Sequence, residues 1–122
     1  IEEQTHNRFT VGAFENETLI GICSFMQEER GKEQHKGWIM QMYVKPEYNG
    51  RKIGFNLLNK TIQLAFEIPA VEQLLLGVMS TNIAANRIYE QAGFVEYGFH
   101  KGYTKEAGRY VDERMMMLRR VE

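Results

Sequence analysis

The sequence predicts an α/β fold of the α+β kind, with a mixed, mostly antiparallel central sheet, one βαβ unit and a C-terminal β-hairpin. Three features predict it. β-rich segments follow one another closely at the start, a helical pattern separates two apolar runs in the middle, and two more β-rich segments end the chain. A length of 122 residues is typical of one domain, so residues 1–122 are expected to fold as a single unit.

Three strands are predicted in the first part of the chain. Residues 8–14 (RFTVGAF) and 18–27 (TLIGICSFMQ) are rich in β-formers, and Asn16-Glu17 lies at a turn between them. The polar stretch 28–36 leads to a third strand at residues 38–44 (WIMQMYV). Short connections of this kind predict an antiparallel meander.

A long helix and a buried strand are predicted next. Six residues are spaced as one face of a helix over about residues 50–67. They are Gly54, Leu57, Leu58, Thr61, Ile62 and Ala65. Pro69 ends the helix, and the apolar run 71–79 (VEQLLLGVM) predicts a strand. A strand, a helix and a strand in this order predict parallel pairing with a right-handed crossover.

A short helix and a hairpin are predicted at the end. Ser80, Thr81 and Asn82 are all N-cap residue types, a helix follows to Ala92, and Gly93 suits the position after its C-cap. Residues 94–101 and 110–119 predict two strands, joined by a loop over residues 102–109.

Composition argues against several kinds of partner and site. The chain has 15 basic and 16 acidic residues, and this balance argues against nucleic acid or an anionic membrane as the main partner. Cys23 is the only cysteine, and His6, His35 and His100 lie far apart, so we expect no disulfide and no metal site. No apolar run is long enough to span a membrane, so we expect a soluble, cytoplasmic protein.

Residues 44–54 (VKPEYNGRKIG) form the first segment that points to chemistry. A strand runs into a turn, two glycines and a helix start, where unpaired N–H groups favour an anion. Gly50 and Gly54 would let a phosphate approach the backbone, and Lys45, Arg51 and Lys52 add positive charge. The alternative is a helix start with glycine for close packing. The spacing matches neither a P-loop nor a Rossmann fingerprint.

Residues 82–94 (NIAANRIYEQAGF) form the second such segment. Ala85, Ile88, Tyr89 and Ala92 share one face of the predicted helix. By itself this pattern makes Tyr89 an ordinary core aromatic and Asn82 only a helix cap.

Together, the two segments resemble motifs of the GNAT superfamily, the N-acetyltransferases that use acetyl-CoA. The family's pyrophosphate loop has the pattern V-x-P-E-Y-[RQ]-G-x-G-[IL]-G, and residues 44–54 depart from it at Asn49 and Lys52. The family's next motif, N-x-x-A-x-x-[LI]-Y-x-x-x-G-F, is matched at every specified position by residues 82–94. The order of elements agrees as well, so the resemblance covers essentially the whole chain. Neither departure removes a backbone N–H donor, although Asn49 reaches less far than the usual Arg.

The resemblance implies a V-shaped slot between the strands at 38–44 and 71–79 that takes acetyl-CoA. It also implies transfer of the acetyl group to an amine of a small molecule, an amino acid or a peptide, with Tyr89 as the general acid. Met42, Tyr43 and Val44 would pair with the pantetheine arm, and Asn82 and Asn86 would bind the cofactor or water. The loop over the pyrophosphate would consist of Asn49, Gly50, Arg51, Lys52, Ile53 and Gly54.

The general base is left open, because the strand at 38–44 carries no carboxylate. Glu28, His35, Asp112, Glu113 and a water chain are the candidates, and Asp112 or Glu113 could instead bind the incoming ammonium. A non-catalytic acyl-CoA-binding module is the alternative function. Family members usually carry a strand and two helices before the meander, so the strand at 8–14 would expose an edge. We expect either further residues upstream or pairing with a second copy as a homodimer.

Overall fold

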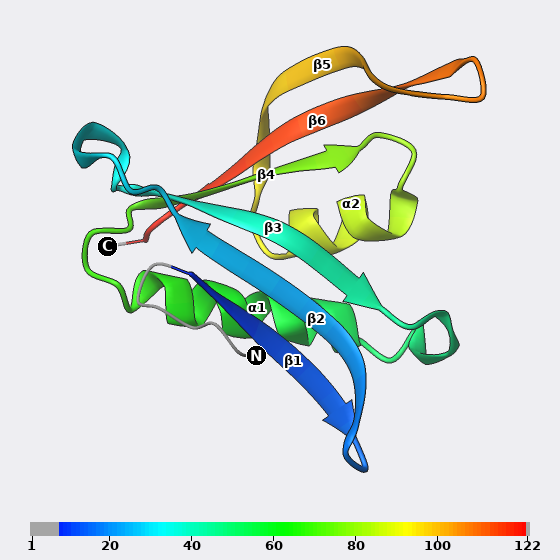
Figure 1. The fold of residues 1–122 in the computed structure, drawn as a ribbon, viewed down its shortest axis with the longest axis horizontal. Helices are drawn as coiled ribbons and strands as arrows, with labels where there is room; N and C mark the ends of the chain where they lie inside the picture. The colour runs from blue at the N-terminus through cyan, green and yellow to red at the C-terminus, as the bar shows by residue number, and fades with distance from the viewer. Residues whose placement is uncertain (1–7, 122) are drawn as a thin grey trace.

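The structure, a computed structural model, describes residues 8–121 (Figure 1). Its helices and strands are β1 (Arg8–Glu15), β2 (Thr18–Gln27), β3 (Lys36–Val44), α1 (Ile53–Phe66), β4 (Gln73–Met79), α2 (Ile83–Gln91), β5 (Val95–Glu106) and β6 (Arg109–Arg119). Short 3₁₀ turns at Gly31–Glu33 and Pro46–Tyr48 precede β3 and α1. The predicted elements are all present in the predicted order.

Within the described residues, the strands form one sheet in the order β1-β2-β3-β4-β6-β5. β3 and β4 pair in parallel, and the other neighbouring strands pair antiparallel. The meander, the βαβ unit and the C-terminal hairpin are therefore confirmed, and with them the predicted mixed fold class.

Both helices pack on one face of this sheet. Leu57 and Leu58 of α1, Tyr89 of α2 and Leu74 and Leu76 of β4 belong to one buried cluster. Alternation along the strands, interrupted in β3 by a register shift between Ile39 and Gln41, leaves the opposite face uncovered by either described helix. Tyr43 and Met79 are among the exposed side chains of this face. The molecule thus has a helix face and an open face.

β3 and β4 diverge soon after they begin. They pair only at Lys36–Gln73, Gly37–Leu74 and Trp38–Leu75, although β3 continues to Val44 and β4 to Met79. Figure 1 shows the two strands separating toward their arrowheads. The separation leaves a V-shaped gap in the sheet, which is the shape that the family resemblance implies.

The two largest differences from the predicted boundaries lie at the start of α1 and in the C-terminal hairpin. α1 begins at Ile53 and not near residue 50, because Gly50 (φ 83°) and Lys52 (φ 61°) have left-handed backbone conformations that a helix excludes. The expected loop at 102–109 is mostly strand. Ala107 and Gly108 have φ of 49° and 77° and make a tight two-residue turn, and β5 and β6 extend directly to it.

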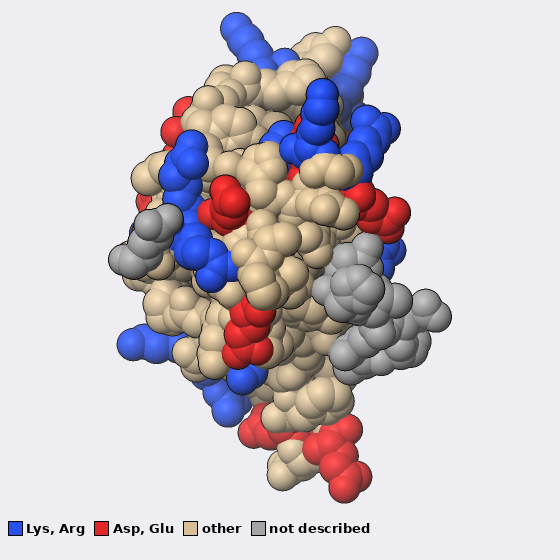
Figure 2. Space-filling model, turned by 90° about the vertical axis from the view of Figure 1, so that its left-hand side faces the viewer, with Lys and Arg blue, Asp and Glu red and all other residues tan. Residues whose placement is uncertain are grey.

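The surface carries charges of both signs. In the view of Figure 2, basic side chains gather toward the top with acidic ones among them, and uncharged atoms occupy much of the remainder. In the part of the chain that is described, neither helix is long and apolar enough to cross a membrane.

Candidate functional site

The first turn of α1 offers backbone N–H groups without partners in the helix. Its N-cap residue, Lys52, makes no side-chain cap, and the first helical hydrogen bond runs from the Asn56 N–H to the Lys52 carbonyl at 3.0 Å. The N–H groups of Ile53, Gly54 and Phe55 therefore have no acceptor within the helix. Together with the partial positive charge of the helix end, they suit a pyrophosphate.

A cavity of about 640 Å³ opens beside this turn. It is bounded by the end of β3, the loop before α1 and one side of α2. Nine of the predicted cofactor residues line it: Met42, Tyr43, Val44, Asn49, Gly50, Lys52, Ile53, Gly54 and Asn82. Its volume lies in the range of about 300–1,000 Å³ that is typical of small-molecule sites. The roles of these residues stay predictions, but the structure brings them together.

Gly54 lets α1 and α2 approach closely at the cavity wall. A β-carbon on Gly54 would lie 3.1 Å from Ile88 Cδ1 and 3.7 Å from Val44 Cγ2. These distances are tight, so the close-packing alternative for this glycine also has a physical basis. Close packing and a backbone N–H without an acceptor in the helix are compatible at the same residue.

Arg51 does not line the cavity. Its guanidinium lies 3.5 Å from the Glu15 carboxylate and stacks over the Tyr48 ring at 5.0 Å. The side chain is thus directed toward the end of β1, and only its backbone belongs to the predicted loop.

Asn86 also lies outside the cavity lining. Its Nδ2 donates to the Met79 carbonyl at 3.0 Å and to the Asn82 carbonyl at 2.7 Å, and its Oδ1 accepts from Arg114. These bonds tie the start of α2 to the end of β4. Asn82 caps α2, because its side chain accepts from the Ala85 N–H at 3.2 Å.

Tyr89 is buried on the helix face. It is 7% exposed, and its ring packs edge-on against Phe94 at 5.9 Å between centroids. Burial raises the pKa of its hydroxyl to about 12, with a smaller contribution from the nearby Cys23. Among the described residues the Tyr89 hydroxyl has no hydrogen-bond partner. Every fully enclosed polar side-chain atom in this part of the chain does have one, so the hydroxyl is not fully enclosed. The hydroxyl therefore keeps some access to solvent and remains protonated at neutral pH.

The candidate bases differ in how their side chains are engaged. Glu28 accepts from the Trp38 indole N–H at 2.8 Å, and Asp112 accepts from the Gly102 N–H at 2.8 Å. His35 lies in the connection before β3, where its carbonyl accepts from the N–H of Glu72. The Glu113 carboxylate forms no hydrogen bond or ion pair within residues 8–121.

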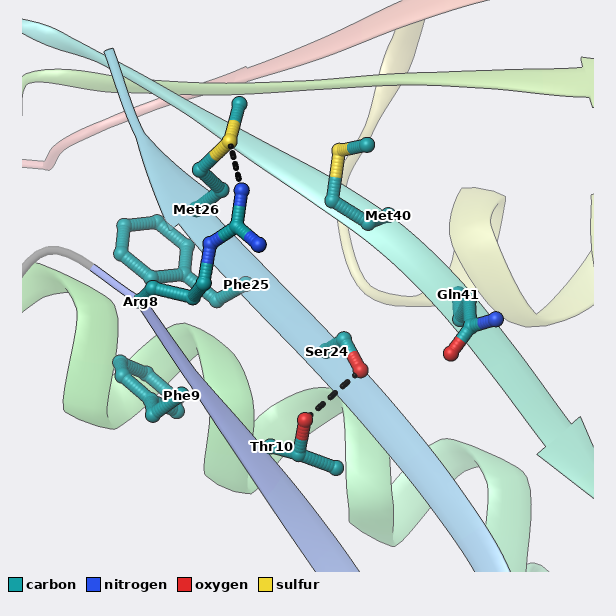
Figure 3. Close-up of a pocket in the computed structure, with 8 residues that line it drawn as sticks. All are labelled: Arg8, Phe9, Thr10, Ser24, Phe25, Met26, Met40 and Gln41. Atoms are coloured by element: carbon teal, nitrogen blue, oxygen red, sulfur yellow. Dashed lines mark hydrogen bonds between the residues drawn. The ribbon is translucent and has the colours of Figure 1, made fainter. Parts of the chain in front are cut away.

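A second cavity of about 390 Å³ lies over β1, β2 and β3 (Figure 3). The Thr10 and Ser24 hydroxyls are 2.9 Å apart at its floor, and the Arg8 guanidinium donates to the Met26 sulfur at 3.0 Å. Gln41 of β3 also borders it. This cavity belongs largely to the open face, on the side of the sheet away from α1 and α2.

The sequence prediction did not include six residues that line the larger cavity: Phe55, Ala84, Ala85, Arg87, Ile88 and Gln91. The sequence did contain a signal for four of them. One helix side that begins near Asn82 has the spacing of Ala84, Arg87, Ile88 and Gln91.

Within residues 8–121, no three His, Cys, Asp or Glu side chains gather as a metal site requires, and His6 lies outside the described residues.

Known proteins share this architecture. The chain is 27% identical over 118 residues to spermidine N(1)-acetyltransferase of Vibrio cholerae, covering 97% of this chain and 66% of that protein. A GNAT-family acetyltransferase from Streptococcus pneumoniae superposes with a TM-score of 0.89 at 27% identity, covering 94% of this chain and 68% of the other. A putative acetyltransferase from Salmonella typhimurium, solved with acetyl-CoA, shares the fold with a TM-score of 0.82 at 23% identity. The match covers 90% of this chain and 63% of the other.

The chain thus spans about two thirds of the length of the curated relative. The model of the acetyltransferase (GNAT) family matches residues 1–94, which include β1 to β4 with the diverging pair, both helices and both sequence motifs. This match covers well over half of the chain and shows that the chain belongs to the acetyltransferase (GNAT) family.

Proposed function

We propose that this chain carries the catalytic domain of an N-acetyltransferase, which moves an acetyl group from acetyl-CoA to a primary amine of a small molecule, amino acid or peptide. The observation that carries this proposal is the set of free N–H groups at the start of α1. They face a cavity of about 640 Å³ that reaches the end of β3, next to the gap in the sheet.

The donor would bind from the start of α1 toward the gap. Its pyrophosphate would accept hydrogen bonds from the N–H groups of Ile53, Gly54 and Phe55, with Lys52 adding positive charge. Beyond Trp38, no residue among 8–121 pairs with β3 on its β4 side, so the backbone of Met42 to Val44 is available to pair with the pantetheine amides. A backbone N–H in this stretch could polarise the thioester carbonyl.

The chemical step is a direct displacement at the thioester carbon. The neutral amine attacks this carbon, a C–N bond forms, and the C–S bond breaks with its electron pair going to sulfur. Tyr89 would supply the proton to the departing thiolate. Its raised pKa keeps the hydroxyl protonated at neutral pH but also makes the phenol a weaker acid, so the transfer relies on its position next to the sulfur. The surplus proton of the amine leaves to water or to an acceptor-side base.

Cationic amines are the first acceptors to test. The Vibrio cholerae relative is named for acetylation of spermidine. We extend this substrate class to the present chain as part of the proposal, together with a cytoplasmic location. Non-catalytic sensing of an acyl-CoA is the alternative, and the absence of a carboxylate on β3 favours it.

Release of free coenzyme A thiol distinguishes the two functions. The purified chain would be mixed with acetyl-CoA and, separately, with spermidine, n-butylamine, an amino acid or a short peptide. We expect release of thiol that depends on at least one amine. Calorimetric binding of coenzyme A without any amine-dependent release would support the sensor, and failure of both measurements would contradict the assignment of the cavity.

A further inference from the structure

Glu113 has a carboxylate that no described residue engages. It lies on β6 opposite Met79 of β4 and is partly buried. Within residues 8–121 its carboxylate makes neither an ion pair nor a hydrogen bond, whereas the carboxylates of Glu90 and Glu96 both pair with Arg114. A carboxylate that no described side chain engages is available to a cation, which would pair with it by charge.

Gly77 provides the space that this carboxylate occupies. A β-carbon on Gly77 would lie 2.8 Å from Glu113 Cδ and would overlap the nearer carboxylate oxygen. Gly77 lies in the regular part of β4, and its φ is outside the left-handed region, so the backbone itself does not require glycine. The missing side chain is needed because the Glu113 side chain lies across β4 at this point.

This position coincides with the point where the sheet opens. Leu75 is the last residue of β4 that pairs with β3, and Gly77 follows it by two positions. Leu76 and Val78 belong to the core on the helix face, so alternation directs the Gly77 position and the Glu113 carboxylate to the open face. The donor cavity lies next to α1 and α2, so the gap has this cavity on one side and a free carboxylate on the other.

We propose that Glu113 anchors the acceptor by binding the ammonium group of a cationic amine at the open-face end of the gap, while Gly77 keeps the position clear. This inference rests on the proposed acetyltransferase function and names the class of acceptor. Met79 and Met115 flank the carboxylate on the same face, so methylene groups next to the ammonium would meet apolar side chains. A cationic alkylamine therefore matches this site better than an acceptor that is anionic near its amine.

Three variants and one control test the anchor. Glu113→Gln keeps the size of the side chain and removes its charge, and Gly77→Ala displaces the carboxylate without removing it. The third variant combines both changes. Glu106→Gln is the matched control, because Glu106 lies at the far end of the β5–β6 hairpin. The probes are n-butylamine and spermidine with saturating acetyl-CoA, and the KM of each amine and kcat are measured separately.

We expect Glu113→Gln to raise the KM of both amines by about 10–100-fold, the range for loss of a hydrogen bond to a charged group. Coenzyme A affinity by calorimetry should stay unchanged, as should all constants of Glu106→Gln. Gly77→Ala should have a similar effect alone and add little in the double variant, because both changes act on one contact. An unchanged amine KM in Glu113→Gln, or full additivity in the double variant, would overturn the proposal.

The anchor can also be tested without turnover. If the unaltered chain releases no thiol with any amine, the proposed function fails, and calorimetry of spermidine with the coenzyme A complex then decides on Glu113 alone. Binding that is about tenfold or more weaker in Glu113→Gln supports the anchor. Equal binding by both proteins, or no binding by either, contradicts it.

Discussion

Lys52 has a left-handed backbone conformation at the start of α1, with φ 61° and ψ 17°. This conformation costs a residue with a β-carbon about 1–2 kcal/mol and costs glycine little. Lys52 nevertheless lines the donor cavity beside the free N–H groups. We interpret the lysine as a compromise, in which backbone strain is accepted for a positive charge near the pyrophosphate.

Two variants at this position separate strain from charge. Lys52→Gly and Lys52→Ala both remove the ammonium group, but only alanine keeps the strained β-carbon. We expect the glycine variant to unfold in urea with a free energy about 1 kcal/mol higher than the alanine variant. Both should bind coenzyme A equally, and more weakly than the unaltered chain. Equal unfolding free energies would contradict the strain argument.

Tyr89→Phe tests the general acid. Phenylalanine keeps the ring that packs against Phe94, so the melting temperature and coenzyme A affinity should change little. Turnover should fall by about 10²–10⁴-fold, the usual contribution of a general acid. A core role alone would leave turnover near normal when chemistry is rate-limiting.

The pH profile gives a second reading of Tyr89. Because burial raises the pKa of its hydroxyl from 10.0 to about 12, the folded protein keeps this proton well above neutral pH. The loss caused by Tyr89→Phe should therefore be the same at pH 7 and pH 9. A loss that fades between these two values would indicate an acid of lower pKa than Tyr89.

At the scale of elements, the donor site depends on how closely α1 and α2 approach. Gly54 faces Ile88 across this contact, and the loop before α1 turns at Gly50, which has φ 83°. One glycine is required by packing and the other by backbone conformation. Both are needed if the phosphate is to reach the backbone.

Substitution of either glycine by valine should weaken coenzyme A binding. Gly54→Val should also lower stability by about 1–3 kcal/mol through overpacking against Ile88. Gly31→Val is the control, because a β-carbon on Gly31 meets nothing within 4 Å. Calorimetry on the folded variants measures the affinity, and unchanged affinity in both Gly50→Val and Gly54→Val would place the pyrophosphate elsewhere.

The sequence predicted the order and type of the elements, because hydrophobic periodicity and turn residues act locally. It placed the start of α1 too early, because periodicity does not show that Lys52 adopts a left-handed conformation. The helical spacing places Asn86 near Asn82. It gives no sign that Arg114, far along the chain, donates a hydrogen bond to the side-chain oxygen of Asn86. The contact of Glu113 with Gly77 is likewise invisible in the sequence, because it depends on the register between β4 and β6.

At the scale of the whole molecule, the sheet separates two surfaces that the gap connects. The helix face holds the proposed donor cavity, and the open face holds the second cavity and the Glu113 carboxylate. β1 forms one edge of this sheet, and its pairing with another strand or a second copy remains a prediction.

Cys23, the only thiol in the chain, is fully buried, and burial raises its pKa to about 11. An acetylated cysteine intermediate is therefore disfavoured.

Initial-velocity kinetics with both substrates varied test direct transfer across the gap most simply. If donor and acceptor must occupy the two sides of the gap together, double-reciprocal plots at several fixed amine concentrations should intersect. The chain incubated with acetyl-CoA alone should show no added acetyl group by mass spectrometry. Parallel lines, together with an acetylated chain, would show that the acetyl group passes through the protein and would contradict transfer within a ternary complex.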